Sequence, residues 1–143
     1  MPLPDSITLE VVTPEGLLLR EEVDDVVVPG SDGYFGVRPG HTPFLATVGS
    51  GQLTYRRGTE THRITCFSGL CEVLADRVNV IVQTAERSGE IDVKRADNAR
   101  RRAEQRMASL RDEEGFEEAQ AEYIRAVVRL QAGGSDSHSH SQT

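Results

Sequence analysis

The segment between residues 33 and 45 constrains this chain most, because it carries three glycines, two prolines and one histidine between β-like runs. Proline fixes φ and removes a backbone donor, whereas glycine permits positive φ. The segment therefore cannot form a regular helix or a central strand. It predicts one surface loop of defined shape on a β scaffold, and such loops commonly carry binding surfaces.

The flanking sequence, from residue 7 to residue 85, reads as a series of short strands with turn signals every eight to twelve residues. This spacing predicts an all-β N-terminal sandwich or barrel built from antiparallel hairpins. No helical segment of crossover length separates the runs, which argues against a parallel sheet. The expected strands are 7–12, 17–20, 23–28, 44–48, 52–57, 62–66, 70–75 and 78–84.

The pattern changes at Ser88-Gly89, after which good helix formers dominate. Residues 92–111 are rich in Ala, Arg, Glu and Gln and predict a first helix, with Asp92 as its N-cap. After an interruption at 112–115, residues 116–132 predict a second helix. The β domain is therefore followed by a C-terminal α-helical hairpin.

Glycine sets the end of the predicted hairpin. Gly133-Gly134 is expected to stop the second helix, and the polar tail 135–143 has no means of burying apolar area, so it is expected to be disordered. The predicted organisation is a sandwich domain over 1–87, a helical hairpin over 88–134 and this tail.

The facing sides of the two helices are rich in alanine. Alanine allows close approach but buries little apolar surface, so the hairpin should be weakly held and is a candidate conformational switch. The predicted apolar positions are Ala96, Ala99, Ala103, Met107 and Leu110 on the first helix, and Phe116, Ala119, Tyr123, Val127 and Leu130 on the second.

Composition excludes several functions. The net charge of −7 argues against a nucleic-acid partner. No apolar run reaches the length of a membrane-spanning helix, and the N-terminus lacks the layout of a signal peptide. We expect a soluble cytosolic protein that reaches a membrane only through partners. Cys66 and Cys71 are expected to be small buried thiols that form neither a disulfide nor a metal site.

Several residues could suggest a catalytic function, but a structural role is favoured for each of them. No phosphate loop is present, and Ser50 lacks the Gly-x-Ser-x-Gly pattern of a nucleophile elbow. The adjacent carboxylates Asp24 and Asp25 would face opposite sides of a strand. His41 could be a general base, although a role in shaping the loop or an interface is favoured. The histidines of the tail are not expected to hold a metal, so we predict no catalytic residue and no metal site.

The glycine- and proline-rich segment resembles a signature of the epsilon subunit of bacterial and chloroplast rotary ATP synthases. A second signature of that family, (Ile/Leu)-Asp-x-x-Arg-Ala, is matched by Ile91, Asp92, Arg95 and Ala96. The resemblance covers residues 7 to about 132. The matching positions of the first signature are Gly33, Gly36, Val37, Pro39, Gly40, His41, Pro43, Phe44 and Leu45.

This resemblance implies a ten-stranded sandwich and a helical hairpin, bound to the gamma subunit and seated on the membrane c-ring. The implied function is that of a non-catalytic central-stalk subunit, which couples rotor rotation to ATP synthesis. The extended helices would contact the alpha and beta subunits and inhibit ATP hydrolysis. The implied location is peripheral, on the cytoplasmic face of the bacterial plasma membrane.

In some bacterial members the hairpin also binds a regulatory ATP, and no cofactor is otherwise required. Arg95 and Arg102 share one helix face, and Arg125 and Arg129 are one turn apart, so four guanidinium groups could hold a polyphosphate. The alternative is solvated arginines that pair with nearby glutamates. The corresponding residues here are Glu86, Asp92, Arg95, Arg102, Arg125 and Arg129.

Two departures from the family affect these expectations. Tyr34-Phe35 stands where some relatives carry an acidic residue, so an electrostatic contact with the c-ring would be weakened or replaced by aromatic packing. The early stop at Gly133-Gly134 would shorten the inhibitory arm. Two other functions stay open at this stage, namely a stand-alone ATP-sensing module with a helical lid and a small enzyme that uses His41.

Overall fold

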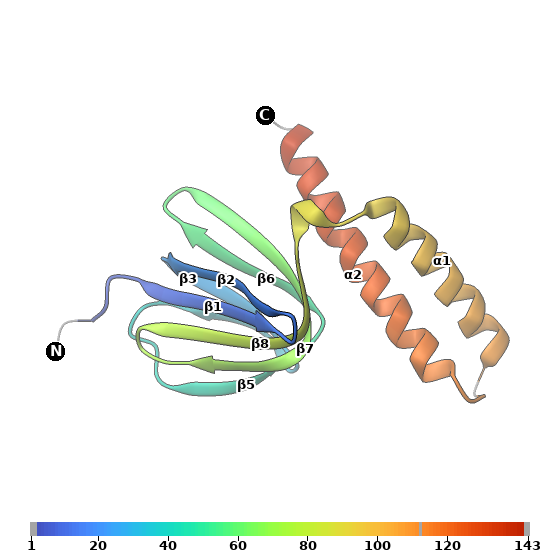
Figure 1. Ribbon diagram of the computed structural model, residues 1–143, viewed down its shortest axis with the longest axis horizontal. Helices are drawn as coiled ribbons and strands as arrows, with labels where there is room; N and C mark the ends of the chain where they lie inside the picture. The colour runs from blue at the N-terminus through green and yellow to red at the C-terminus, as the bar shows by residue number, and fades with distance from the viewer. Residues whose placement is uncertain (1–2, 112, 142–143) are drawn as a thin grey trace. The chain divides into compact units, whose positions relative to one another are not determined.

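The computed structural model describes residues 3–111 and 113–141, with the backbone alone for 134–141. The chain divides into two compact units, Met1–Glu86 and Arg87–Thr143. Figure 1 shows the first as a body of strands and the second as a pair of helices. The division falls one residue before the predicted boundary after Arg87.

The first unit is the predicted β-sandwich, with eight strands instead of the ten implied by the resemblance. The predicted strands 62–66 and 70–75 are one long strand, and an additional strand forms within the glycine-rich segment. The strands are β1 (Ile7–Thr13), β2 (Gly16–Val23), β3 (Asp25–Gly30), β4 (Gly33–Val37), β5 (Phe44–Val48), β6 (Gly51–Arg57), β7 (Glu60–Val73) and β8 (Arg77–Arg87).

The strands pair in the order β2-β1-β8-β7-β5-β3-β4, and β6 pairs with both β3 and β7. This double pairing folds the sheet back on itself, so that the two layers enclose one core. The hairpin pairs are antiparallel, as predicted, but β1 and β8 pair in parallel, with Val11 opposite Val80. They lie at opposite ends of the domain sequence, so the whole domain serves as their connection.

β7 takes part in both layers because it bends at Ser68-Gly69. Ser68 has a φ of 54°, and residues before it pair with β6 while residues after it pair with β5. A Cβ at Gly69 would overlap the backbone of Ile81 and Val82 on β8. Glycine is therefore required at position 69, where the backbones of β7 and β8 approach closely. The bend takes the place of the turn that the sequence predicted between strands 62–66 and 70–75.

The core follows the period-two alternation of the strands. In β1 the residues Ile7, Leu9 and Val11 are fully buried, while their neighbours Thr8 and Glu10 lie at half-buried positions. β8 repeats this pattern. The buried cluster comprises Ile7, Leu9, Val11, Leu19, Val23, Val26, Val28, Val37, Val48, Leu53, Tyr55, Ile64, Cys66, Cys71, Val73, Val78, Val80 and Val82.

The glycine-rich segment is not a loop along its whole length. Residues 33–37 form β4, which pairs with β3 at the end of the strand order, and residues 44–45 begin β5. Gly33 has a φ of 132° and supplies the turn into β4. The irregular part is therefore 38–43, which contains both prolines, where the missing donors interrupt no sheet pairing.

The second unit contains the predicted helical hairpin. A short 3₁₀ turn, Ser88–Glu90, leads to α1 (Val93–Leu110), and α2 spans Phe116–Ser141. Asp92 is the N-cap, as predicted, because its Oδ1 accepts a hydrogen bond from the Arg95 backbone N–H at 3.0 Å. Gly115 turns the chain into α2 with a φ of 95°.

The prediction that Gly133-Gly134 ends the second helix was wrong, since α2 continues through both glycines to Ser141. Gly133 is not in the left-handed conformation that ends a helix. A Cβ at Gly133 would overlap the Val93 side chain, so this glycine permits close packing. Residues 135–141 are assigned to α2, and 142–143 lie outside the described residues, so the expected disorder of the tail 135–143 stays a prediction.

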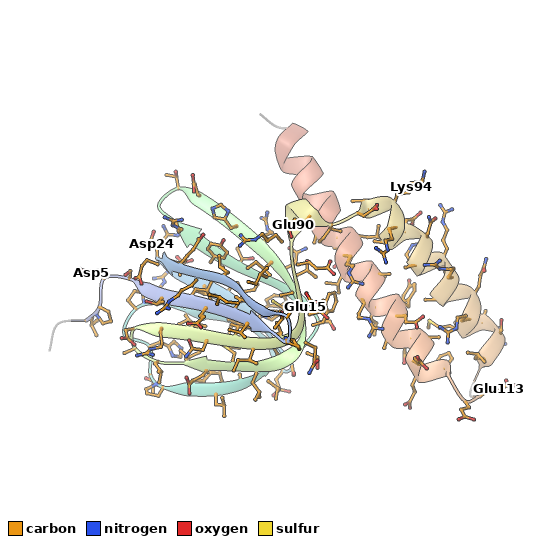
Figure 2. All side chains as sticks on the ribbon, viewed as in Figure 1. Asp5, Glu15, Asp24, Glu90, Lys94 and Glu113 are labelled. Atoms are coloured by element: carbon orange, nitrogen blue, oxygen red, sulfur yellow. The ribbon has the colours of Figure 1, made fainter. Side chains whose placement is uncertain are left out.

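The seam between the helices is made of small residues. Ala96 and Ala103 on α1 and Ala119 on α2 are buried, as predicted, and so is Ala126, which was not predicted. The larger predicted residues Tyr123, Val127 and Leu130 are only half-buried. Figure 2 shows the long polar side chains projecting from both helices, among them Lys94 at the start of α1.

Candidate functional site

Local backbone contacts hold the loop at residues 38–43 in shape. Gly40 has a φ of 85°, and its N–H donates to the Ala75 carbonyl at 2.8 Å, which ties the loop to the β7–β8 turn. A Cβ on Gly40 would also collide with the Leu3 side chain. Position 40 therefore requires glycine for backbone conformation and for space.

His41 contributes to the loop in the structure through local contacts. Its Nδ1 hydrogen-bonds the Thr42 carbonyl oxygen at 2.6 Å, and its ring lies 6.5 Å from the Phe44 ring, centroid to centroid. Phe44 in turn packs edge-on against Phe35, with centroids 5.4 Å apart. This arrangement supports the role in loop shape that the sequence favoured for His41.

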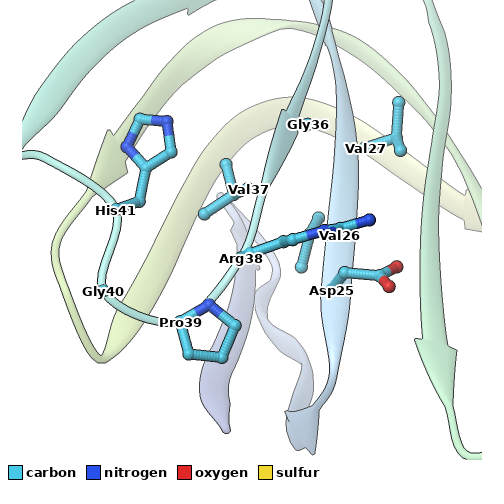
Figure 3. A pocket seen from close by; sticks show the side chains of 9 residues that line it. All are labelled: Asp25, Val26, Val27, Gly36, Val37, Arg38, Pro39, Gly40 and His41. Carbon is cyan, nitrogen blue, oxygen red and sulfur yellow. The ribbon is translucent and has the colours of Figure 1, made fainter. Parts of the chain in front are cut away.

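A hollow of about 480 Å³ lies beside the loop, on the outer side of β3 and β4. Figure 3 shows the Arg38 side chain extending over β3 beside Asp25, with Pro39 and His41 at the rim. Gly36 lines the hollow, and a Cβ there would meet nothing within 4 Å. Gly36 is thus free of the steric demand that fixes Gly40, and its backbone leaves open space at the hollow.

The sandwich also exposes an apolar row that the sequence analysis missed. Leu17 and Ile81 both pair with Val12. Asn79 on β8 donates a hydrogen bond to Glu72 on the neighbouring β7 at 3.0 Å, and two residues further along each strand Ile81 and Leu70 lie beside each other on the same face. Leu17, Leu70 and Ile81 are 57%, 48% and 59% exposed. The signal was present in β8, where Ile81 stands at a polar-side position between core residues Val80 and Val82.

The hairpin carries a second candidate site, which we call the arginine pocket. It is a hollow of about 380 Å³ lined by Ala99, Arg102, Arg106, Glu122, Arg125 and Arg129. Three lining residues come from each helix, at spacings of three, four or seven residues that place them on one face. The structure therefore brings together the predicted Arg102, Arg125 and Arg129, and it adds Arg106 and Glu122.

The other predicted ATP-site residues lie elsewhere. Asp92, Arg95 and Arg102 line a second hollow together with Lys94 and Asn98, so Arg102 is common to both. Among the described residues, Glu86 lines neither hollow, and it is the last residue of the first unit. Asp92 already uses one carboxylate oxygen as the N-cap of α1.

Other arginines of α1 form ion pairs along the helix, as the alternative interpretation of this region held. Arg100 pairs with Asp97 at 3.1 Å and with Glu104 at 3.0 Å, and Arg101 pairs with Asp97 at 3.1 Å. The hydrogen bonds that Arg100 donates to the Asp97 carboxylate are the main cause that raises the pKa of Arg100. These arginines stabilise one helix and leave the pocket to other residues.

The two thiols match their prediction, because Cys66 and Cys71 are free and buried in the sandwich core. Burial raises the pKa of each thiol to about 12. Within the described residues, no three His, Cys, Asp or Glu side chains gather as a metal site. None of the helices in that part of the chain is long and apolar enough to cross a membrane.

The fold is therefore a β-sandwich with a shaped, partly apolar surface, followed by a helical hairpin whose facing sides carry arginines. Two family models cover nearly all of this chain. The β-sandwich domain of the ATP synthase delta/epsilon chain matches residues 6–88, and the long α-helix domain of the same chain matches residues 90–134. The chain belongs to the ATP synthase delta/epsilon chain family.

Similar proteins agree with this assignment. The ATP synthase epsilon chain of Syntrophobacter fumaroxidans is 48% identical over 126 residues, which cover 88% of this chain and 94% of that protein. The epsilon chain of Nitratidesulfovibrio vulgaris is 42% identical and covers 91% and 97%, respectively. Family membership makes the chain a non-catalytic central-stalk subunit of an ATP synthase.

Solved structures share the fold. A chain in the Euglena gracilis mitochondrial ATP synthase, in the OSCP/F1/c-ring assembly, aligns with a TM-score of 0.71 at 22% identity and covers 92% of this chain and 79% of its own length. A chain of the Tetrahymena thermophila mitochondrial ATP synthase central stalk and c-ring aligns with a TM-score of 0.58 at 14% identity, covering 89% and 96%.

Proposed function

We propose that the sandwich transmits rotation by binding the gamma subunit and the c-ring, with the surface around residues 33–45 as one interface. The observation that carries this proposal is the exposure of apolar side chains around a loop whose shape is fixed from within. Tyr34, Phe44 and Leu45 are 60%, 47% and 67% exposed. Such a patch on a shaped surface is typical of a protein interface.

The aromatic pair Tyr34-Phe35 defines how this interface would work. The Tyr34 hydroxyl accepts a hydrogen bond from the Gln52 N–H at 3.1 Å, which fixes the ring at the surface, while Phe35 packs against the core. We therefore expect a rigid apolar contact with the c-ring. The apolar row of Leu17, Ile81 and Leu70 offers a second surface, suited to the gamma subunit.

Replacing Gly36 by Val tests the interface. Because a Cβ at Gly36 meets nothing inside the chain, Gly36→Val should leave the thermal unfolding midpoint of the isolated subunit nearly unchanged. In the reconstituted synthase the added side chain should fill the hollow and reduce ATP-driven proton pumping several-fold.

Gly40→Val is the matched comparison. Residue 40 has a positive φ, and a Cβ at this position would overlap the Leu3 side chain. The valine should therefore strain the loop, and this variant should lose stability as well as coupling. Normal coupling by a folded Gly36→Val synthase would contradict an interface at this hollow.

The hairpin is the proposed regulatory part. Extended, it would reach the alpha and beta subunits and hinder ATP hydrolysis; folded, it would bind one ATP through the arginine pocket and the adjoining hollow at Asp92 and Arg95. Four arginines around one hollow support this assignment, because guanidinium groups bind phosphate oxygens bidentately. The ATP would be a regulatory ligand, and no other cofactor is proposed.

The proposed location is the cytoplasmic face of the bacterial plasma membrane, where the subunit would be held peripherally by gamma and the c-ring. Co-purification distinguishes this function from that of a stand-alone ATP-sensing module. A tagged chain should purify with gamma, alpha and beta subunits, and recovery of the chain alone from solubilised membranes would favour the free-standing module.

A further inference from the structure

The arginine pocket contains its own carboxylate. Glu122, on α2, accepts a hydrogen bond from Arg106 Nη1 on α1 at 2.7 Å, so this ion pair joins the two helices. Both side chains are partly exposed, at 39% and 45%. The ion pairs of Arg100 differ, because their partners Asp97 and Glu104 lie on the same helix.

The charges that face Glu122 explain what its carboxylate does. Arg102 and Arg106 line the hollow from α1, and Arg125 and Arg129 line it from α2. Glu122 is the acidic residue among them. An incoming phosphate is repelled by this carboxylate and must share or take over Arg106, whose guanidinium already has an anionic partner.

Displacing the carboxylate is feasible for a ligand. Partly exposed ion pairs contribute little to stability, because water screens both charges. A polyphosphate carries several charges and oxygens, so it can replace one carboxylate at Arg106 and also engage the neighbouring arginines. Glu122 would thus weaken binding without preventing it.

We propose that Glu122 acts as an internal competitor that lowers the affinity of the arginine pocket for polyphosphate ligands. The role rests on the proposed nucleotide site. When the pocket is empty, Glu122 pairs with Arg106 across the two helices; when a polyphosphate binds, the polyphosphate takes the place of the carboxylate at Arg106. The residue thereby determines the ligand concentration at which the folded hairpin is stabilised.

The test is calorimetric titration of the full chain with ATP and, separately, with inorganic triphosphate. Glu122→Gln keeps the shape and removes the charge, so it should tighten binding of both ligands by roughly five- to tenfold at low salt. The gain should shrink as salt screens the charge. Glu104→Gln is the control, because Glu104 pairs with Arg100 outside the pocket, and it should change affinity less than twofold.

The outcomes separate this role from the nucleotide site. If the unaltered chain and Glu122→Gln bind both ligands equally, the competitor role is overturned and the site stands. If Glu104→Gln gains as much as Glu122→Gln, the effect is one of overall charge and the role is again overturned. If neither protein binds at millimolar ligand, the nucleotide site and the role of Glu122 both fail. Circular dichroism should show equal helix content in all three proteins.

Discussion

At the scale of single residues, the glycines of this chain have separate physical duties. Gly40 needs its positive φ, Gly69 needs to lack a Cβ where β7 meets β8, and Gly133 makes room for Val93. Gly36 has none of these constraints within the chain. A substitution at Gly36 should therefore affect binding to a partner without destabilising the chain itself.

The buried thiols give a prediction in which pH has a defined sign. Burial raises the pKa of Cys66 and Cys71 from 9.0 to about 12, so folding favours the protonated forms. The corresponding stability is complete below pH 9 and is lost as pH rises from about 9 to about 12. Unfolding midpoints in urea, measured from pH 8 to pH 11, should therefore fall.

Alkylation measures the same effect directly. Iodoacetamide at pH 8 should leave both thiols of the folded chain unmodified, because thiolate is the reactive form and neither sulfur is accessible. In urea both should react, as seen by mass spectrometry. Rapid labelling of either thiol in the folded chain would contradict the burial of these residues.

At the scale of elements, the hairpin combines an alanine-rich interface between its two helices with the arginine pocket. The buried seam is largely alanine, which buries little apolar area for each residue. The arginines of the pocket add like charges along the same helix pair. A ligand that neutralises them should therefore stabilise the folded hairpin through its binding affinity.

Amide exchange tests this stabilisation. Millimolar ATP should slow exchange across residues 93–133 several-fold, and Arg102→Ala should remove most of the effect, because Arg102 lines both hollows. Arg95→Ala should remove less of the effect, since Arg95 lines the second hollow but is not among the residues that line the arginine pocket.

Arg102→Lys controls for loss of charge, because it keeps the cation and loses the bidentate geometry. Equal exchange with and without saturating ATP would leave the arginines as solvated surface charges.

At the scale of the whole molecule, the chain is a β-sandwich and a helical hairpin that form separate compact units. The sandwich has a continuous aliphatic core of its own. The boundary near Arg87 coincides with the end of β8, so the first unit has all of its strands without the hairpin. This division is consistent with the proposed function, in which the sandwich binds the rotor and the hairpin changes its conformation.

Truncation after Arg87 uses that division. The shortened subunit should still assemble, since every strand is retained. ATP hydrolysis by the complex should rise several-fold, because the helices that we propose to hinder hydrolysis are absent. ATP hydrolysis by membranes that carry each form measures the effect. An unchanged rate in a fully assembled complex would argue against inhibition by the hairpin in this synthase.

Much of the fold could be predicted from the sequence because the signals are local. Alternation located the strands, the side chain of Asp92 marked the start of α1, and Gly115 lies in the predicted interruption between the helices. The predicted end of α2 failed because Gly133 fits against Val93, a residue forty positions away in the sequence. Propensity describes the isolated segment and contains no information about that contact.

The candidate sites, like the fold, were predictable from the sequence only in part. The sequence by itself determined that a shaped glycine- and proline-rich loop would stand on a β scaffold, and that arginines would share faces of two helices. Only the tertiary structure decided that Arg106 and Glu122 join the pocket and that Leu17, Ile81 and Leu70 form one apolar row. The physical reason is that periodicity fixes which face a side chain occupies, whereas strand register and helix packing decide which faces meet.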